Sequence, residues 1–279
     1  MDGALGAERA DLDFRGVDVA ALRRALHAHK LLVFRDQELT PASFSSAAAR
    51  LGPLDVYPYA EPLAGHPHVV RVLKEAGDDA NFGGAWHTDM PYVAEPPAIT
   101  LLYAVQVPAT GGDTLFADMV AAFERCSPGF QHFLRGLVGL HTAGLIHGAG
   151  GAHAKVAGQS VAVRPDAAIS EAGHPLVLSD GPSGRNSLYF SLVHTSHFRG
   201  MTRQESLPLL EQLHRLATAA ENTTRLRWRP GTLAVWDNRA VQHYPLNDYP
   251  GQRREMHRIV LKGDRPGGGP GPGKHETTT

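Results

Sequence analysis

Short apolar runs separated by polar turns recur along the whole chain and predict many short strands. The clearest is the run from Ile99 to Val107 (ITLLYAVQV), whose continuous apolar character is typical of a buried strand. Two other segments, residues 17–29 and 202–219, carry apolar residues at helical spacing. The pattern predicts strands at residues 30–34, 69–73, 99–107, 114–117, 175–178, 187–191, 226–228, 232–236 and 255–262, and helices at 17–29, 40–50, 119–125 and 202–219.

These strands and helices do not alternate regularly, so the pattern favours an antiparallel sandwich or jelly roll with helices packed outside. The chain has 279 residues, of which 42% are hydrophobic, and we expect a single domain over residues 1–263. Residues 141–173 are rich in Gly and Ala without a clear period, and we interpret them as a lid. Residues 264–279 are rich in Gly and Pro and are expected to form a disordered tail.

Composition removes several classes of function. The chain carries 27 basic and 28 acidic residues, a balance that gives no broad basic surface for nucleic acid or an anionic membrane. Its one cysteine, Cys126, excludes an intramolecular disulfide and a multi-cysteine zinc site. No apolar run is long enough to cross a bilayer, and the N-terminus lacks an apolar signal core. We therefore expect a cytoplasmic protein and leave a homo-oligomer open.

The triplet His87-Thr88-Asp89 is the first candidate for chemistry. In an extended segment, residues two apart project to the same side, so His87 and Asp89 can bind one ion. A distant histidine would complete two histidines and one carboxylate, and His243, just after a predicted strand, is the candidate. Such a triad leaves positions open for a bidentate keto acid and O₂ on Fe(II). Alone, the triplet is also typical of an ordinary surface or capping pair.

The segment Arg253 to Arg258 gives an independent signal. In a strand, Arg254, Met256 and Arg258 share one face. A keto acid that chelates iron leaves a second carboxylate, which a planar guanidinium binds through two hydrogen bonds. One arginine can thus hold the cosubstrate while the other faces the substrate. A solvated basic edge strand remains the alternative interpretation of the same run.

Together these residues resemble the taurine dioxygenase family, which includes the taurine and 2,4-dichlorophenoxyacetate dioxygenases. The resemblance extends through most of the chain, and its order and intervals also fit. The matching segments are LLVFRDQELTP at 31–41, VYPYAE at 56–61, WHTDMPY at 86–92, PPAITLLYAVQVPATGGDTLF at 96–116, HPLV at 174–177 and WDNRAVQHYPLNDYPGQRREMHR at 236–258.

The resemblance implies a mainly β fold with flanking helices, a double-stranded β-helix (jelly roll, cupin-like), with iron between its sheets. It implies Fe(II) as the metal, 2-oxoglutarate as cosubstrate and O₂ as oxidant. The residues expected at the site are His87, Asp89 and His243 on the metal, Thr114 and Arg254 on 2-oxoglutarate, and Arg258 and Tyr57 on the substrate.

Three departures from the taurine enzyme bear on the substrate. Leu54 replaces a sulfonate-binding histidine, Gly83 replaces an asparagine four residues before the first iron ligand, and His194 replaces a phenylalanine near the substrate. These departures predict a small acidic substrate other than taurine. The carboxylate of Asp89 argues against halogenation, since related halogenases carry a small residue there.

The resulting hypothesis is an enzyme that hydroxylates a small acidic substrate and releases succinate and CO₂. One alternative is the same iron-dependent oxidation ending in desaturation, cyclisation or another oxidation. A second is a non-catalytic ligand-binding protein on the same fold. A zinc hydrolase also uses two histidines and a carboxylate, but it has no need of Arg254.

Overall fold

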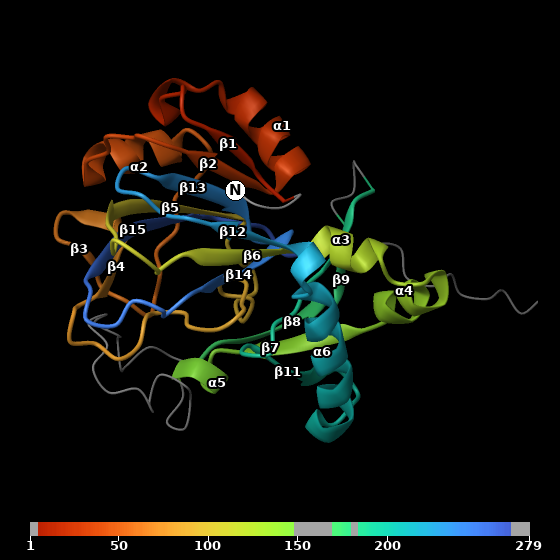
Figure 1. Ribbon diagram of the computed structural model, residues 1–279. Helices are drawn as coiled ribbons and strands as arrows, with labels where there is room; N and C mark the ends of the chain where they lie inside the picture. Colours follow the sequence, from red (N-terminus) through yellow and green to blue (C-terminus); the bar gives the residue numbers. More distant parts are fainter. Residues whose placement is uncertain (1–4, 148–168, 180–183, 269–279) are drawn as a thin grey trace, which may run out of the picture.

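The computed structural model describes residues 5–147, 169–179 and 184–268, and its centre is a sandwich of two β-sheets (Figure 1). The larger sheet has seven strands in the order β1-β2-β13-β5-β15-β4-β3, and the smaller has three in the order β12-β6-β14. Every pairing in these two sheets is antiparallel except that of β1 with β2. The strands are β1 (Ala7–Arg9), β2 (Leu31–Phe34), β3 (Pro62–Leu63), β4 (His66–Lys74), β5 (Ile99–Gln106), β13 (Leu233–Asp237) and β15 (Arg254–Leu261) in the larger sheet, and β6 (Thr114–Asp118), β12 (Thr223–Leu226) and β14 (Val241–Pro245) in the smaller.

Apolar side chains from both sheets fill the space between them. Phe116 of β6 packs edge-on against Trp236 of β13 with ring centroids 5.5 Å apart, and Met256 of β15 belongs to the same buried cluster. Because side chains alternate along a strand, Arg254 and Arg258 lie on the same face of β15 as Met256. Both arginines are buried. The sandwich therefore encloses positive charge beside its apolar core.

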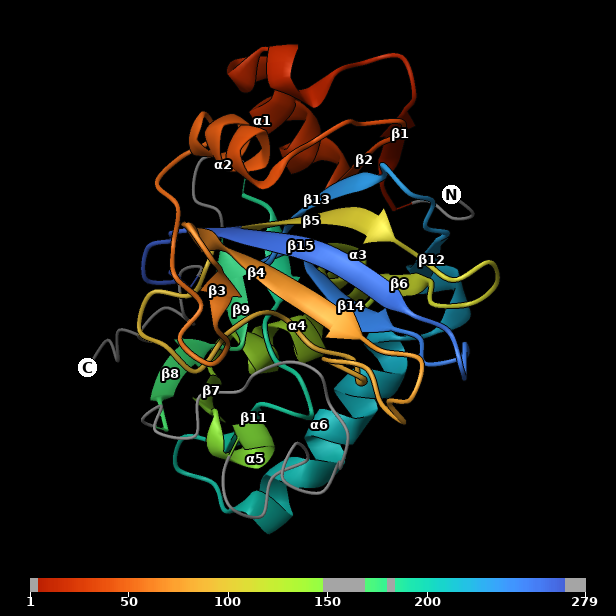
Figure 2. The ribbon, with the colours of Figure 1, turned by 90° about the vertical axis from the view of Figure 1, so that its left-hand side faces the viewer.

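Helices α1 (Val19–His29) and α2 (Pro41–Ala49) cover the outer face of the larger sheet, at the top of Figures 1 and 2. Asp18 caps α1 by accepting from Ala21 N, and Thr40 forms a capping box with Ser43, with Pro at the first helical position. Their apolar faces join the outward side chains of the sheet in a second buried cluster. This packing confirms the predicted mainly β class with helices outside.

The remaining elements lie beside and below the smaller sheet in Figure 1, with α3, α4 and α6 towards the right and α5 at the lower left. A three-stranded sheet in the order β11-β7-β8 and a hairpin of β9 with β10 pack with α3 and α6. The helix α6 begins at a capping box formed by Thr202 and Glu205. The bounds are α3 (Met119–Glu124), α4 (Pro128–Arg135), β7 (Val138–Thr142), α5 (Gly144–His147), β8 (Glu171–Pro175), β9 (Val177–Ser179), β10 (Asn186–Leu188), β11 (Thr195–Phe198) and α6 (Arg203–Ala217), with short 3-10 turns at Phe14–Gly16 and Ala220–Asn222.

The structure differs from the sequence-based prediction at several strands. The predicted strand at 175–178 is broken at Leu176, because β8 pairs with β7 whereas β9 pairs with β10. A strand was predicted at 226–228, but the observed strand, β12, ends at Leu226, because its pairing with β6 begins earlier, at Thr223. Strand β14 was not predicted, and it contains His243, which was expected only to follow a strand. The elements β1, β3, β7, β11, α4 and α5 are also additions.

The proposed lid and tail fall largely outside the described residues. Of the range 141–173, the described ends belong to β7, α5 and β8, and residues 148–168 lie outside the description. Of the tail, residues 264–268 pack on the chain, where Gly268 bridges Leu178 and Gly267 O accepts from Ser179 N. No helix within the described part of the chain has the length and apolar character that crossing a membrane requires.

Buried histidines predict an acid-sensitive fold. His141 is 1% exposed, and burial, reinforced by His174, lowers the pKa of His141 from 6.5 to about 3. Since the unfolded chain binds this proton first, stability falls as pH drops from about 6.5 towards 3, by up to about 1.4 kcal/mol per pH unit for this group. Urea unfolding of the metal-free protein at pH 7 and pH 5 measures the loss. His141→Asn is expected to reduce it, and an unchanged pH dependence in that variant would contradict the prediction.

Candidate metal centre

His87 and His243 come from distant parts of the chain and are joined by two backbone hydrogen bonds. His87 N–H donates to His243 O over 3.0 Å, and His243 N–H donates to His87 O over 2.8 Å. His243 lies in β14, opposite Phe116 of β6, so this bridge adds the His87 segment to the edge of the smaller sheet. The two imidazole rings therefore lie on the same side, with centroids 4.1 Å apart.

Asp89 brings a carboxylate to the two rings. Its Oδ1 lies 3.9 Å from His87 Nε2 and 4.0 Å from His243 Nε2. One ligand atom from each residue lies within 4.8 Å of the other two. Met90 follows with φ of 49°, a left-handed conformation that is rare outside glycine, so the backbone turns sharply just after the carboxylate. Two nitrogens and one oxygen converging from one side fit an Fe(II) ion that keeps open positions.

A chain of buried hydrogen bonds holds the other oxygen of Asp89. Thr100 Oγ1 donates to Asp89 Oδ2 over 2.6 Å, and Asn238 Nδ2 donates to Thr100 Oγ1 over 2.7 Å. Trp236 Nε1 donates to Asn238 Oδ1 over 2.8 Å, which fixes the amide orientation. Because Thr100 already accepts from Asn238, its hydroxyl proton is directed to Asp89. Oδ2 is thereby engaged, and Oδ1 faces the imidazoles.

The three residues have the protonation states that metal binding requires. Burial lowers the pKa of His87 and, more strongly, that of His243, so both imidazoles are neutral at pH 7. His87 Nδ1 lies 2.7 Å from Ala85 O, a contact that needs a proton on Nδ1 and leaves Nε2 as the ligand atom. Burial would raise the pKa of Asp89, but Arg258 and the two histidines outweigh it and lower the pKa below 3.8.

Arg258 lies next to the same carboxylate. Its Nη2 is 2.8 Å from Asp89 Oδ1, and its guanidinium lies 4.9 Å from the ring centroid of Tyr57. Nη2 makes an ion pair with the carboxylate but lacks hydrogen-bond alignment. Arg258 is thus held at the metal centre with capacity to donate to a further acceptor.

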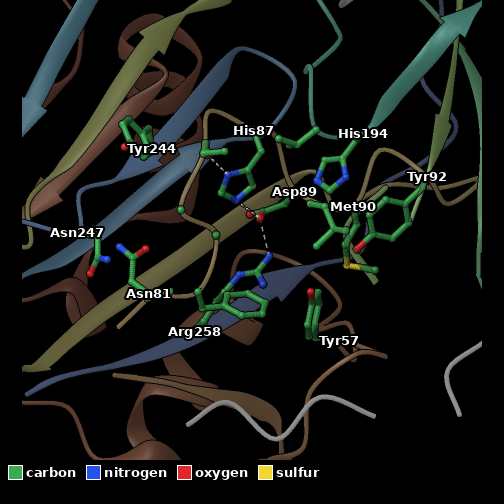
Figure 3. A pocket seen from close by; sticks show the side chains of 17 residues that line it. Tyr57, Asn81, His87, Asp89, Met90, Tyr92, His194, Tyr244, Asn247 and Arg258 are labelled. Atoms are coloured by element: carbon green, nitrogen blue, oxygen red, sulfur yellow. Dashed lines mark hydrogen bonds and ion pairs between the residues drawn. The ribbon is translucent and has the colours of Figure 1, made fainter. Parts of the chain in front are cut away.

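A cavity of about 390 Å³ opens beside the triad, and Figure 3 shows its labelled side chains. His87, Asp89 and Arg258 lie together at one side of it. Its remaining lining is largely aromatic and apolar, with a few amides and hydroxyls. These residues are Tyr57, Ala80, Asn81, Phe82, Gly83, Gly84, Ala85, Met90, Tyr92, Ile146, Val193, His194, Tyr244 and Asn247.

A second, smaller cavity of about 40 Å³ shares the triad residues His87 and Asp89 but extends towards Thr114 and Arg254. Arg254 is 5% exposed and donates through Nε to Gly112 O over 3.2 Å, while its Nη2 has no hydrogen-bond partner. Trp228 Nε1 donates to Thr114 Oγ1 over 2.9 Å, which leaves the Thr114 hydroxyl proton for another acceptor. The two cavities meet at the metal centre.

The sequence-based site residues therefore fall into three groups. The triad is brought together, Thr114 and Arg254 line the smaller cavity, and most of the predicted substrate residues line the larger one. Leu54 lines neither cavity: it bridges Leu261 and packs against the cluster beneath α1 and α2. The predicted residues lining the larger cavity are Tyr57, Gly83, His194 and Arg258.

Other lining residues were not predicted from the sequence. Tyr92 and Asn247 stand inside the matching segments at 86–92 and 236–258, so the resemblance could have indicated them. Ile146 and Val193 carry no sequence signal, because only the packing of α5 and of the turn before β11 brings them to the cavity.

Comparison with known proteins agrees with this geometry. Residues 1–260 match the family model described as taurine catabolism dioxygenase TauD, TfdA family. An alpha-ketoglutarate-dependent sulfate ester dioxygenase from Pseudomonas putida is 32% identical over 286 residues, covering 95% of this chain and 89% of that protein. An alpha-ketoglutarate-dependent 2,4-dichlorophenoxyacetate dioxygenase from Cupriavidus pinatubonensis is 32% identical, covering 94% of this chain and 95% of that protein.

The fold is also found among solved structures. A putative alpha-ketoglutarate-dependent taurine dioxygenase from Burkholderia xenovorans superposes with a TM-score of 0.81 at 29% identity, covering 98% of this chain and 94% of that one. A taurine dioxygenase from the same organism superposes with a TM-score of 0.78 at 30% identity, covering 96% and 91%. These neighbours confirm the predicted double-stranded β-helix.

The hydrogen bond from Thr100 to Asp89 predicts a loss of metal affinity when it is removed. Thr100→Val keeps the shape of the side chain but leaves Oδ2 without a donor, and we expect the Kd for Mn(II) to rise roughly tenfold or more. Thr100→Ser keeps the hydroxyl and is the matched control. Calorimetric titration of Mn(II) into the metal-free proteins measures the affinity, and equal affinities of the two variants would remove Thr100 from this role.

Proposed function

The chain belongs to the TauD/TfdA family of dioxygenases, and from this premise we propose that it hydroxylates a small organic substrate bearing an acidic group. It is a 2-oxoglutarate-dependent dioxygenase that uses Fe(II) and O₂, with His87, Asp89 and His243 as the metal-binding triad. The acidic substrate, the hydroxylation and the roles of the remaining site residues are the proposal. Succinate and CO₂ are the expected coproducts.

The cosubstrate assignment depends on one observation, which is that the guanidinium of Arg254 is buried without an ion-pair partner among the described residues. A buried guanidinium is costly unless an anion compensates it, and no carboxylate among the described residues forms an ion pair with it. Its Nη2 lacks a partner, and Thr114 has a hydroxyl proton to donate nearby. The distal carboxylate of 2-oxoglutarate supplies two oxygens for these donors, while its keto acid end reaches the metal.

When bound, iron and 2-oxoglutarate supply oxidative decarboxylation by O₂ and the oxidation of a substrate C–H bond. The chain's own residues hold and orient the reactants. Arg258 is the main group that keeps Asp89 ionised, and Thr100 holds Oδ2 so that Oδ1 is left for the metal. The His87–His243 bridge fixes both imidazoles. The aromatic lining of the larger cavity excludes water from the reacting carbon.

Charge balance supports an acidic substrate. At the metal end of the site, Arg258 and a divalent cation carry three formal positive charges, whereas Asp89 and the chelating carboxylate of 2-oxoglutarate carry two negative charges. A single anionic group on the substrate would neutralise the remainder, with Arg258 as its partner at the base of the larger cavity. The relatives named above act on a sulfate ester and on 2,4-dichlorophenoxyacetate, both of which carry an anionic group.

We assign the wall of the larger cavity to the rest of the substrate. Tyr57, which lies under Arg258, and His194, which packs edge-on against Tyr92 at 5.1 Å, flank the cavity from two sides. Gly83 has φ of 77°, and a Cβ there would lie 2.9 Å from His87 Cε1. Glycine at this position keeps space between the substrate cavity and the metal ligand.

A substrate panel tests the proposed function. Fe(II)-loaded protein is incubated with 2-oxoglutarate, O₂ and small sulfates, sulfonates and aryloxy or alkyl carboxylic acids, and succinate and product masses are measured. We expect one oxygen atom to enter the substrate as succinate forms. The product is heavier by one oxygen where the hydroxylated carbon carries no leaving group; where that carbon bears the sulfate, sulfonate or aryloxy group, the adduct collapses to a carbonyl product and free sulfate, sulfite or phenol. Asp89→Ala is expected to abolish both products, because it removes the only carboxylate of the triad. Substrate-dependent succinate without any oxygenated product would argue against hydroxylation.

Arg254 offers a separate test of the cosubstrate site. Arg254→Ala removes the guanidinium that faces the smaller cavity, and we expect the KM for 2-oxoglutarate to rise by about two orders of magnitude, with a smaller change for substrate. Arg253→Ala is the matched control, since Arg253 lies on the opposite face and pairs with Glu75 and Glu255. Equal effects of the two substitutions would reassign Arg254.

A further inference from the structure

Lys74 lies directly opposite Arg254 in the larger sheet. The register of β4 with β15 pairs these two residues, so their side chains leave the sheet on the same face and start from neighbouring positions. Lys74 is 3% exposed and Arg254 is 5% exposed. Two buried cations thus start from neighbouring positions, and one of them, Arg254, lines the smaller cavity.

Among the described residues, no carboxylate neutralises this pair at close range: Asp113 acts on Arg254 only from beyond ion-pair distance and is itself paired with Arg225. No carboxylate in the described part of the chain forms an ion pair with either cation. The Lys74 ammonium instead lies 4.6 Å from the ring centroid of Tyr249, which is itself 1% exposed. Tyr249 also packs beside Gly112, whose carbonyl accepts from Arg254 Nε.

Like charges placed directly opposite each other on a sheet destabilise it, and burial strengthens the repulsion. Arg258, further along the same strand, has Asp89 as its counter-ion, so the unbalanced charge is confined to the Lys74–Arg254 end. A carboxylate at this end would neutralise one of the two buried positive charges and would be attracted by both. The distal carboxylate of 2-oxoglutarate is the group that the proposed function brings there.

We propose that Lys74 is a second cation of the cosubstrate site, which with Arg254 selects keto acids carrying a distal carboxylate. The inference rests on the proposed function, because it takes 2-oxoglutarate as the ligand. Lys74 does not line the smaller cavity, so it acts as a positioning residue through its charge and its packing on Tyr249. The ring of Tyr249, 4.6 Å from the ammonium, holds it on the side of the sheet from which Arg254 also projects.

The test compares two ligands that differ only in the distal carboxylate. 2-Oxoglutarate and 2-oxopentanoate have the same chain length and the same chelating end. Calorimetric titration of each into Mn(II)-loaded protein without O₂ gives their dissociation constants. For Lys74→Met we expect 2-oxoglutarate to bind roughly tenfold more weakly, because the substitution removes one buried positive charge from this end of the sandwich, with 2-oxopentanoate changed less than about twofold.

Lys74→Arg keeps the charge, so we expect its Kd for 2-oxoglutarate to stay within about threefold of the wild-type value. A lysine that acted only through packing would give no reason for this retention. Lys262→Met is the control, since Lys262 is exposed just beyond the other end of β15. Thermal unfolding of the metal-free proteins adds an independent readout. Loss of the repulsion is expected to leave the melting temperature of Lys74→Met equal to or above that of the wild type, whereas a purely structural lysine would lower it.

Equal weakening of both ligands, or no change for either, would overturn the assignment of Lys74. If Lys74→Met does not fold, Lys74→Gln takes its place, and the comparison of the two ligands is unchanged. Failure of the wild-type protein to bind 2-oxoglutarate at all would overturn the proposed function instead. The two failures are therefore distinct.

Discussion

Burying charge in the space between two apolar sheets is the constraint on which this site depends. An unpaired ion there costs several kcal/mol, so each buried charge needs a partner with a defined position. Asp89 is paired with Arg258 and accepts from Thr100, and both residues are themselves buried. Arg254 and Lys74 lack such a partner among the described residues, which is the reason for proposing that their end of the sandwich binds an anion.

The carboxylate of Asp89 couples the two cavities. Oδ2 is engaged by Thr100, so Arg258 and a metal ion share the single remaining oxygen. Arg258 therefore keeps its counter-ion in the metal-free protein and loses part of it when the carboxylate ligates a cation. Its affinity for an external anion is then expected to be higher in the loaded protein. This linkage favours loading of the metal and cosubstrate before an acidic substrate.

Much of the fold followed from local pattern, and the exceptions have physical causes. Helix α2 was predicted from Thr40 and Pro41, and the capping box with Ser43 explains why these two residues were sufficient. Strand β14 was missed because Val241–Pro245 is short, mixes polar and apolar residues and ends in proline. It is a strand because β6 offers its edge, a tertiary pairing that no local window contains.

The sequence could predict those parts of the site that depend on the alternation of side chains within one extended segment. The alternation of β15 was enough to place Arg254 and Arg258 on one face, and the spacing of His87 and Asp89 was enough to pair them. Leu54 was expected at the substrate because it stands where the taurine enzyme has a sulfonate-binding histidine, but its contact with Leu261 takes it to the outer core. Lys74 shows the opposite case. In the sequence it is an ordinary lysine at the end of a strand, and only the register between β4 and β15 places it beside Arg254. Charges that matter through their neighbours across a sheet become visible only once the strands are paired.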